Sequence, residues 1–437
     1  MQITFETLAG ATYFFVCVFV TFMRLIAYRE FKPVDFSMLT MGVVYGIITP
    51  IVYKNAGLIS FPGDQFVASA VGLFYIHTLM AVLATVGIYF GWQFGRTRKL
   101  TSLSTNGTTK SISVGLAVMC VFSVLTQYLY TLDYGGFLGY FEYNLLIRAA
   151  SLETTERSSF SFLRPFGGFA VVSCLGYYGL ILSKKRSSFI FIGFSFSLIA
   201  AGYFLYSSAG RIAILAFIAS ILAAPLMVHR HRFYTWFIGY FGIVIGGIAS
   251  VYLLSDLLSL NASSSFDKFI VEEASFPISS FFGQIFVGSG PYYFLDVLLS
   301  PAYLLPSSLT QSWLSSADVY NTIAIMGARK GENGVTGGIP TDLITFGFMQ
   351  FNFVGVLIYG VIVGALIRWC YTAAQSFKVE GLRSAFTSYV FFNISAFVVF
   401  YSQPKHLLVN QFAFIASVMG VFFWATICKP ILKIGKR

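Results

Sequence analysis

The residues best suited to chemistry in this 437-residue chain are cations in and beside two long polar segments, residues 133–164 and 256–341. Arginine binds phosphate through two parallel hydrogen bonds and keeps its charge, so several arginines on one face of a protein indicate an anionic, phosphorylated ligand. Salt bridges to nearby glutamates would explain single members of this group equally well. The candidate phosphate-binding residues are Arg148, Arg157, Arg164, Arg211, Arg329 and Lys330.

Arg211 stands out because it follows a tight turn, Ser207–Gly210, between two apolar runs and opens the second run. A charge at the edge of the hydrocarbon is costly and is a functional candidate by default. The helix N-terminus adds its own attraction for anions. The alternative is an arginine that extends its side chain to lipid headgroups.

A group-transfer reaction at this face also needs a base for the attacking hydroxyl. The candidates are Glu332 in a glycine-rich loop, Asp342 at its end, and His406 in the turn 403–406; the pair Glu272 and Glu273 is a further option. The glycine-rich loop could wrap around a phosphate with its amides, or be a solvated hairpin. Asp342 has a structural alternative as a helix cap.

Other chemistries find little support in the sequence. His77 lies within an apolar run and is interpreted as a hydrogen-bonded core histidine. The sequence contains no HExxH motif, metal-ligand histidine pair, Walker loop or dinucleotide fingerprint, so we expect no catalytic metal and no cofactor. The cysteines lie in or at the ends of apolar runs, which argues against disulfides and thiolate metal sites: Cys17, Cys120, Cys174, Cys370 and Cys428.

The elements that must position these residues are membrane helices. Hydrophobic residues make up 57% of the chain, charged residues 10%, and the mean hydropathy is +0.77, which excludes an ordinary soluble protein. We expect one all-α polytopic domain over residues 1–437, with Leu8–Met23 as a retained first span rather than a cleaved signal peptide. Apolar runs near bilayer length predict about eleven spans, at 8–26, 36–53, 67–93, 111–132, 165–183, 188–207, 211–228, 234–255, 342–367, 384–403 and 407–428.

Charge asymmetry predicts the orientation. Assigning alternate loops to the cytoplasm places most of the 28 Lys and Arg residues on one side, with few acids. Because cytoplasmic loops are rich in Lys and Arg, the N-terminus is predicted outside and the C-terminus in the cytoplasm. The net charge of +11 is then explained by topology, and no nucleic-acid partner is expected.

Residues 133–164 and 256–341 are thereby two large outer loops, longer than simple connections. In the second, residues 291–306 are apolar but short and interrupted by proline, which predicts a segment lying in the membrane interface or re-entering it. Such a segment could wall a lipid-facing cleft or merely cover the bundle. Gly360 and Gly364 predict close helix packing.

These features together resemble a known family. The eleven or so spans, the two large outer loops, the Gly–Arg turn at Arg211 and the sequence Gly337-Gly-Ile-Pro-Thr-Asp-Leu-Ile-Thr-Phe-Gly347 followed by Gly355 are similar to the O-antigen polymerases (Wzy type). The resemblance covers most of the chain by topology but only short stretches by motif. It implies a fold like that of the GT-C membrane glycosyltransferases.

The resemblance also implies an activity: joining undecaprenyl-diphosphate-linked oligosaccharide repeat units at the periplasmic face of a bacterial inner membrane, without metal or nucleotide sugar. A chain-length regulator and a flippase are the implied protein partners. Outer loops of this family can carry an arginine and a glycine separated by ten residues. Arg157 and Gly168 fit that spacing, whereas Pro340 stands at the corresponding position after Arg329.

Two alternatives remain open at the level of sequence. A flippase for lipid-linked oligosaccharides, or another secondary transporter, would show charged or broken helices near the midplane, often in repeated halves. Mid-span polar residues are few here, His77 and Gln127 among them. An O-antigen ligase would differ from a polymerase only in its acceptor.

Overall fold

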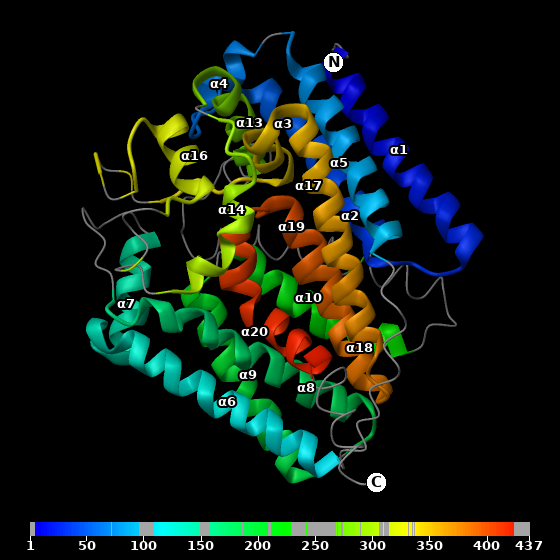
Figure 1. Cartoon of the computed structure of the whole chain (residues 1–437), viewed down its shortest axis with the longest axis vertical. Helices are drawn as coiled ribbons and strands as arrows, with labels where there is room; N and C mark the ends of the chain where they lie inside the picture. Colours follow the sequence, from blue (N-terminus) through cyan, green and yellow to red (C-terminus); the bar gives the residue numbers. More distant parts are fainter. Residues whose placement is uncertain are drawn as a thin grey trace.

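The computed structural model describes most of the chain as helices that pack into one bundle (Figure 1). Within the described residues there is no β-strand. Apart from a few single positions, the described residues are 5–70, 72–95, 109–148, 158–185, 187–208, 211–228, 274–288, 290–305, 314–330 and 337–423. The predicted span 234–255 lies almost wholly outside them.

Eight helical stretches in the described part are long and apolar enough to cross a membrane, so the protein is membrane-embedded. They coincide with eight of the predicted spans: Glu6–Tyr28, Pro33–Asn55, Phe74–Phe94, Thr109–Tyr134, Ser161–Leu182, Ser188–Ser207, Leu343–Gln375 and Glu380–Phe400. The predicted span 211–228 forms the shorter helix α10 (Arg211–Val228). The span 407–428 begins within α20 (Pro404–Phe423) and continues beyond the described residues.

Several of these stretches are composite. Two contain π-helix, η1 (Gly42–Ile48) and η5 (Val390–Ala396), a rare form that is often found at functional sites. The elements that build the long stretches are α1 (Phe5–Tyr28), α2 (Pro33–Met41), α3 (Thr49–Asn55), α5 (Phe74–Phe94), α6 (Thr109–Thr131), η2 (Leu132–Tyr134), η3 (Ser161–Gly168), α8 (Phe169–Leu182), α9 (Ser188–Ser208), α17 (Leu343–Gln375), α18 (Glu380–Tyr389) and α19 (Phe397–Phe400).

Short helices lie in the two long polar segments. The first segment contains α7 (Gly136–Arg148), and Asp133 accepts hydrogen bonds from Ser158 and Ser159 that bring the ends of that segment together. The described part of the second contains α13 (Phe276–Val287), α14 (Leu295–Leu298), η4 (Ser300–Leu304) and α16 (Ala317–Met326), while α4 (Asp64–Ser69) precedes α5. None of these helices is long enough to cross a bilayer.

Contacts between helix ends agree with the predicted alternation of loops. On one side, which we call the loop side, Ser402 N donates to Thr341 O and Lys405 pairs with Asp318. On the opposite side, which we call the cation-rich side, Gly381 N donates to Ser183 Oγ. Figure 1 shows α7, α14 and α16 together at the left of the molecule, with the start of α20 beside α14.

The helices α5 and α17 pack closely together, and glycine makes this possible. A Cβ atom on Gly364 would lie 2.1 Å from Ile88 O, and one on Gly91 would lie 2.0 Å from Val361 O. Gly360 faces Gly87 in the same way. The predicted role of Gly360 and Gly364 in close packing is thus confirmed, because small residues let the two backbones touch.

Hydroxyl and amide side chains join the remaining helices. Ser173 and Tyr177 of α8 donate to carbonyls of α6, and Asn393 of η5 and Ser388 of α18 donate to Ser220 of α10. Interhelical hydrogen bonds of this kind hold membrane bundles together where hydrophobicity alone gives no preference.

Helix α17 is two helices joined by a sharp bend. Phe351 and Asn352 have non-helical backbone angles, and Asn352 has a positive φ of 51°. The short first helix, 343–350, folds back so that a Cβ atom on Gly355 would lie 2.2 Å from Gly347 O. The sequence predicted a span over 342–367. In the structure the long helix begins after the bend and extends to Gln375.

Replacing Gly364 by alanine tests the α5–α17 packing. We expect Gly364→Ala to destabilise the protein by about 1–3 kcal/mol because its methyl group overlaps Ile88 O. Thermal unfolding in detergent measures the effect as a lower Tm. The control is Gly115→Ala in α6, where no atom lies within 4 Å and alanine favours the helix. Equal Tm values for the two variants would contradict the packing.

Candidate functional site

The loop side is organised around a junction at residues 339–342, of which Thr341 and Asp342 are fully buried. Asn321 of α16 is fully buried and donates to Ile339 O and Pro340 O, while Thr322 Oγ1 accepts from Ile339 N. Thr341 O accepts from Ser402 N. These bonds tie the end of the glycine-rich loop to α16 on one side and to the start of α20 on the other.

This junction brings two charged groups together. Lys405 Nζ lies 3.1 Å from Asp318 Oδ2 and 3.0 Å from Ser316 Oγ, which in turn donates to Asp318. The exposed fractions of the Lys405 and Asp318 side chains are 36% and 15%, so the pair is half-buried. Gly338 lies close to the same carboxylate: a Cβ atom on Gly338 would be 3.9 Å from Asp318 Oδ2.

His406 of α20 and Arg164 of η3 complete the arrangement, because α20 packs against both η4 and η3. Both His406 and Arg164 are half-buried. His406 lies within the electrostatic influence of Asp318, Lys405 and Arg164. Arg164 donates to Ser207 O at the end of α9, 3.4 Å away. Asp296 of α14 is buried beside the Asp318–Lys405 pair.

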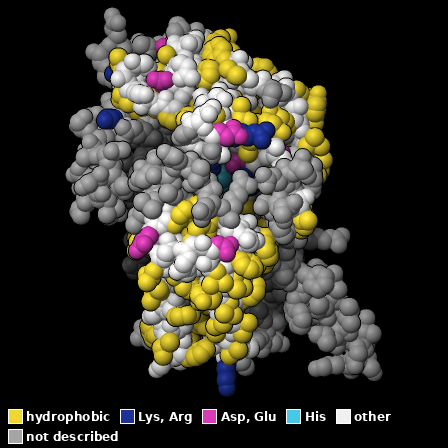
Figure 2. Space-filling view, turned by 90° about the vertical axis from the view of Figure 1, so that its left-hand side faces the viewer, with side chains coloured by type: hydrophobic (Ala, Val, Ile, Leu, Met, Phe, Trp, Pro, Cys, Tyr) yellow, Lys and Arg dark blue, Asp and Glu magenta, His cyan; other side chains and the backbone are white. Residues whose placement is uncertain are grey.

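We call Arg164, Asp296, Asp318, Lys405 and His406 the outer cluster. Figure 2 shows acidic and basic side chains with a histidine in a recess in the middle of this face. Tyrosines border the cluster: Tyr303 donates to Asp296 at 3.3 Å, and the rings of Tyr292 and Tyr320 lie 4.8 Å apart. Tyrosine offers an apolar ring with a polar tip, which suits a ligand that is partly apolar and partly hydroxylated.

The electrostatics of the outer cluster keep His406 neutral. His406 precedes the predicted span 407–428, and burial, together with the charges of Lys405 and Arg164, lowers its pKa to about 4. Burial alone would raise the pKa of Asp318, but the Lys405 ammonium and His406 outweigh it and lower this pKa to about 2. Burial raises the pKa of Asp296 to about 6. At neutral pH the cluster therefore holds a neutral imidazole beside a charged Asp–Lys pair.

Of the six candidate phosphate-binding cations, the structure brings Arg164 to the cluster. Arg211 begins α10, four residues after the Ser207 carbonyl that Arg164 contacts. Only the backbone of Arg211 and of Arg148, at the end of α7, is described. Arg157 lies outside the described residues.

Arg329, Lys330 and Glu332 stand apart from the cluster. They follow the C-terminal end of α16, whereas Asp318 is near its start, and at a rise of about 1.5 Å per residue the helix separates them by roughly 12 Å or more. Arg329 N donates to Glu332 Oε2 in an exposed turn. The geometry matches the interpretation of this part of the loop as a solvated hairpin.

Asp342 is the N-cap of α17, which confirms its structural interpretation. Its side chain accepts hydrogen bonds from Ile344 N, Thr345 N and Tyr45 Oη, the last at 2.8 Å. With no exposed surface, it is closed to an acceptor substrate. The capped helix, however, is the short one before the bend.

His77 is a core residue, as predicted, but its environment is aromatic. Its ring packs against Tyr45 and Phe281, with centroids 5.5 and 5.0 Å away. The hydrogen bond that we expected for it does not occur among the described residues.

Four cysteines are buried and form no disulfide, and Cys428 lies outside the described residues. No group of three or more metal-ligating side chains occurs in the described part of the chain.

Three members of the outer cluster were not among the predicted site residues: Asp296, Asp318 and Lys405. One signal for Asp296 is present in the sequence, because it is the single acid in the apolar segment 291–306. An ionisable group within such a segment is a functional candidate. Asp318 and Lys405 carry no comparable local signal.

Comparison of the chain with protein-family models, curated proteins and solved structures gave no match.

A double-mutant cycle tests the Lys405–Asp318 pair. We expect Lys405→Met and Asp318→Asn each to destabilise the protein, with a coupling energy of about 1 kcal/mol because the pair is half-buried. Thermal or denaturant unfolding in detergent measures it. The control is the Lys32–Glu30 pair, whose charged atoms lie 3.9 Å apart and whose Glu30 side chain is 58% exposed, and its coupling should be near zero. Full additivity at Lys405 and Asp318 would mean that the two side chains do not interact.

Proposed function

We propose that the protein is a metal-independent membrane glycosyltransferase that joins lipid-diphosphate-linked oligosaccharide repeat units, as the O-antigen polymerases of the Wzy type do. The observation that supports this most is the outer cluster. It places a neutral histidine next to an arginine and an Asp–Lys pair at the edge of a membrane bundle. A base and cations in one place are what transfer from a diphosphate leaving group requires.

His406 is the proposed base. Glu332 is exposed and outside the cluster, Asp342 uses its carboxylate for helix capping, and Glu272 and Glu273 lie outside the described residues. Of the predicted candidates that the structure describes, His406 alone lies in the cluster. Because its imidazole is neutral at pH 7, it can accept a proton from an acceptor sugar hydroxyl. The charged Asp318 next to it favours the imidazolium that forms.

The reaction then proceeds by displacement. The deprotonated hydroxyl oxygen attacks the anomeric carbon of the donor sugar, and the bond from that carbon to the diphosphate oxygen breaks. Arg164 is the proposed group that neutralises the departing diphosphate, with Arg211 as a second contributor from the adjacent turn. The tyrosines Tyr292, Tyr303 and Tyr320 would border the sugar units.

In this proposal the loop side faces the periplasm and the cation-rich side faces the cytoplasm, in a bacterial inner membrane. The donor and acceptor are both carried on undecaprenyl diphosphate and reach the cluster from the outer leaflet. The fold would be of the GT-C kind, and a flippase and a chain-length regulator would be partners.

The bend in α17 and the π-helices η1 and η5 keep the transporter alternative in view, because broken helices are common in transporters. The bend, however, lies at the loop side, where Tyr292 N and Phe294 N donate to Met349 O and Gln350 Oε1. Assaying lipid-linked oligosaccharide movement in vesicles without acceptor distinguishes a flippase from a polymerase: movement without bond formation would favour the flippase.

Attachment of a single chain to lipid A core would instead indicate a ligase.

Substitutions in the outer cluster test the proposed roles. In liposomes supplied with undecaprenyl-diphosphate-linked repeat units, His406→Gln should slow chain extension by about 10²–10⁴-fold, the contribution of a positioned base. Arg164→Ala should also shorten the products, because the leaving group loses a countercharge. The matched control is Arg29→Ala, which removes an exposed arginine on the cation-rich side. Normal chain lengths in both cluster variants, correctly folded, would refute the proposal.

The pH profile identifies the base. If His406 is the base, the rate should rise with pH through about 4, the lowered pKa of its imidazole, and stay level through pH 6. A rise centred near pH 6 would assign the role to Asp296, whose buried carboxyl has its pKa raised to about that value. Single-turnover rates between pH 3.5 and 8 would separate the two.

A further inference from the structure

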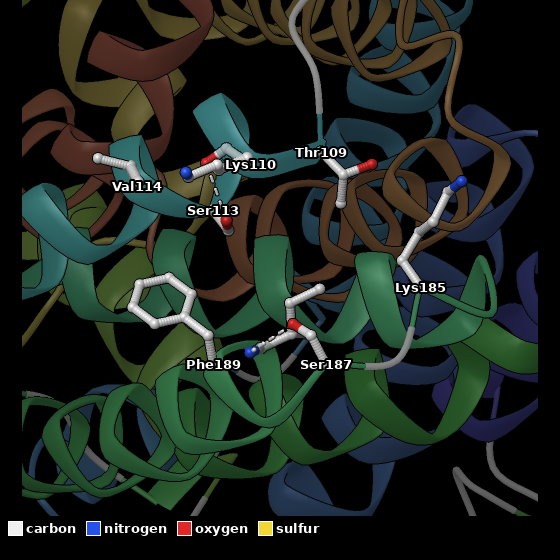
Figure 3. A pocket seen from close by; sticks show the side chains of 8 residues that line it. Thr109, Lys110, Ser113, Val114, Lys185, Ser187 and Phe189 are labelled. Carbon is white, nitrogen blue, oxygen red and sulfur yellow. Dashed lines mark hydrogen bonds between the residues drawn. The ribbon is translucent and has the colours of Figure 1, made fainter.

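A groove of about 440 Å³ opens on the opposite side of the molecule from the outer cluster. It lies between the start of α6 and the connection from α8 to α9, and its lining includes Lys110, Val114, Lys185, Ser187 and Phe189. Figure 3 shows Lys110 and Lys185 on opposite sides of the groove with Thr109 between them, and Phe189 and Ser187 together along the facing wall. Nothing in the proposed function uses this groove.

The groove has a charged rim and an apolar body. Lys110 and Lys185 are exposed. Val114 and Phe189 are 48% and 51% exposed, and they continue into exposed apolar side chains farther along the same helices, Val118 on α6 and Ile192 on α9. These rows of apolar side chains are the lipid-facing surfaces of two membrane-crossing stretches. The groove thus runs from the cation-rich surface into the hydrocarbon zone.

The floor of the groove is held rigidly. Tyr177 Oη donates to Ser113 O at 2.7 Å, Ser113 Oγ donates to Lys110 O, and Ile190 N donates to Ser187 Oγ. Gly193 lies flat against the Tyr177 ring, since a Cβ atom there would be 2.5 Å from it. α6, α8 and α9 are therefore locked together below the groove, and the site is preformed.

We propose that this groove binds the glycerophosphate headgroup and upper acyl chains of an anionic phospholipid from the leaflet on the cation-rich side. Two ammonium groups at the rim match the negative charge of the headgroup, and the hydroxyl of Ser187 lines the same groove. The exposed faces of Val114 and Phe189 match the acyl chains. Basic pockets between membrane helices on the cation-rich side are suited to such headgroups.

Lipid titration followed by native mass spectrometry tests this proposal. The intact protein in detergent is titrated separately with phosphatidylglycerol, with phosphatidylethanolamine and with inorganic phosphate. We expect one tightly bound phosphatidylglycerol per protein, about fivefold weaker binding for Lys110→Ala or Lys185→Ala, and about 25-fold weaker binding for the double variant. Phe189→Ser should weaken it as well.

The controls separate loss of binding from loss of folding. Lys378→Ala removes an exposed lysine from the connection between α17 and α18, on the same side but outside the groove, and should leave binding unchanged. Lys110→Arg/Lys185→Arg should retain most of it. Unchanged phosphatidylglycerol binding in the double alanine variant would overturn the proposal. Equally lysine-dependent binding of inorganic phosphate, independent of Phe189, would also overturn it, because the site would then be one for a free anion.

Discussion

A polypeptide that enters a membrane must satisfy its backbone hydrogen bonds within the protein, and residues 339–342 meet this requirement through several other segments. Asn321 and Thr322 of α16 bind Ile339 and Pro340, and Ser402 binds Thr341. The carboxylate of Asp342 is shared between its own helix and Tyr45. The relative positions of α16, α17 and α20 on the loop side follow from these few bonds.

The outer cluster is a consequence of that junction. Asp318 stands one turn before Asn321 and Thr322, and Lys405 stands three residues after Ser402. The junction bonds that hold α16 and the start of α20 therefore also hold Asp318 next to Lys405. Since α20 packs against both η3 and η4, it carries His406 between Arg164 and Asp318. Burial disfavours the imidazolium there, and the neighbouring cations disfavour it further. The result is a neutral imidazole next to a charged Asp–Lys pair on this face of the protein.

The two sides of the bundle differ in chemistry. The loop side combines acids, cations and tyrosines around His406. The cation-rich side has a groove with lysines at its rim and apolar walls. The first arrangement suits a reaction on a diphosphate-bearing glycan and the second suits a lipid that stays bound. Close packing of α5 on α17 through glycines, and of α6 on α8 through hydroxyls, gives both sides a rigid support.

The local sequence was sufficient to locate eight of the eleven predicted membrane-crossing helices and the close-packing glycines. Apolar runs of bilayer length and a small-residue pair depend only on neighbours in the chain, so residues 188–207 and Gly360 with Gly364 were found without tertiary information. The cap at Asp342 was recognisable for the same reason. Arg164 and His406 were chosen by residue type and predicted side, and the sequence alone ranked them no higher than Arg329 or Glu332.

Only the tertiary structure decided which of these candidates meet. Asp318 and Lys405 lie 87 residues apart and carry no local signal, and a salt bridge between them needs the junction that brings α16 to α20. The bend at Phe351 and Asn352 was equally hidden, because neither residue is a helix breaker and the bend depends on hydrogen bonds from residues 292–294. Patterns along a chain determine which segments enter the membrane. Contacts between distant segments determine where charges gather, because the energy of a charge pair depends on distance and burial rather than on sequence order.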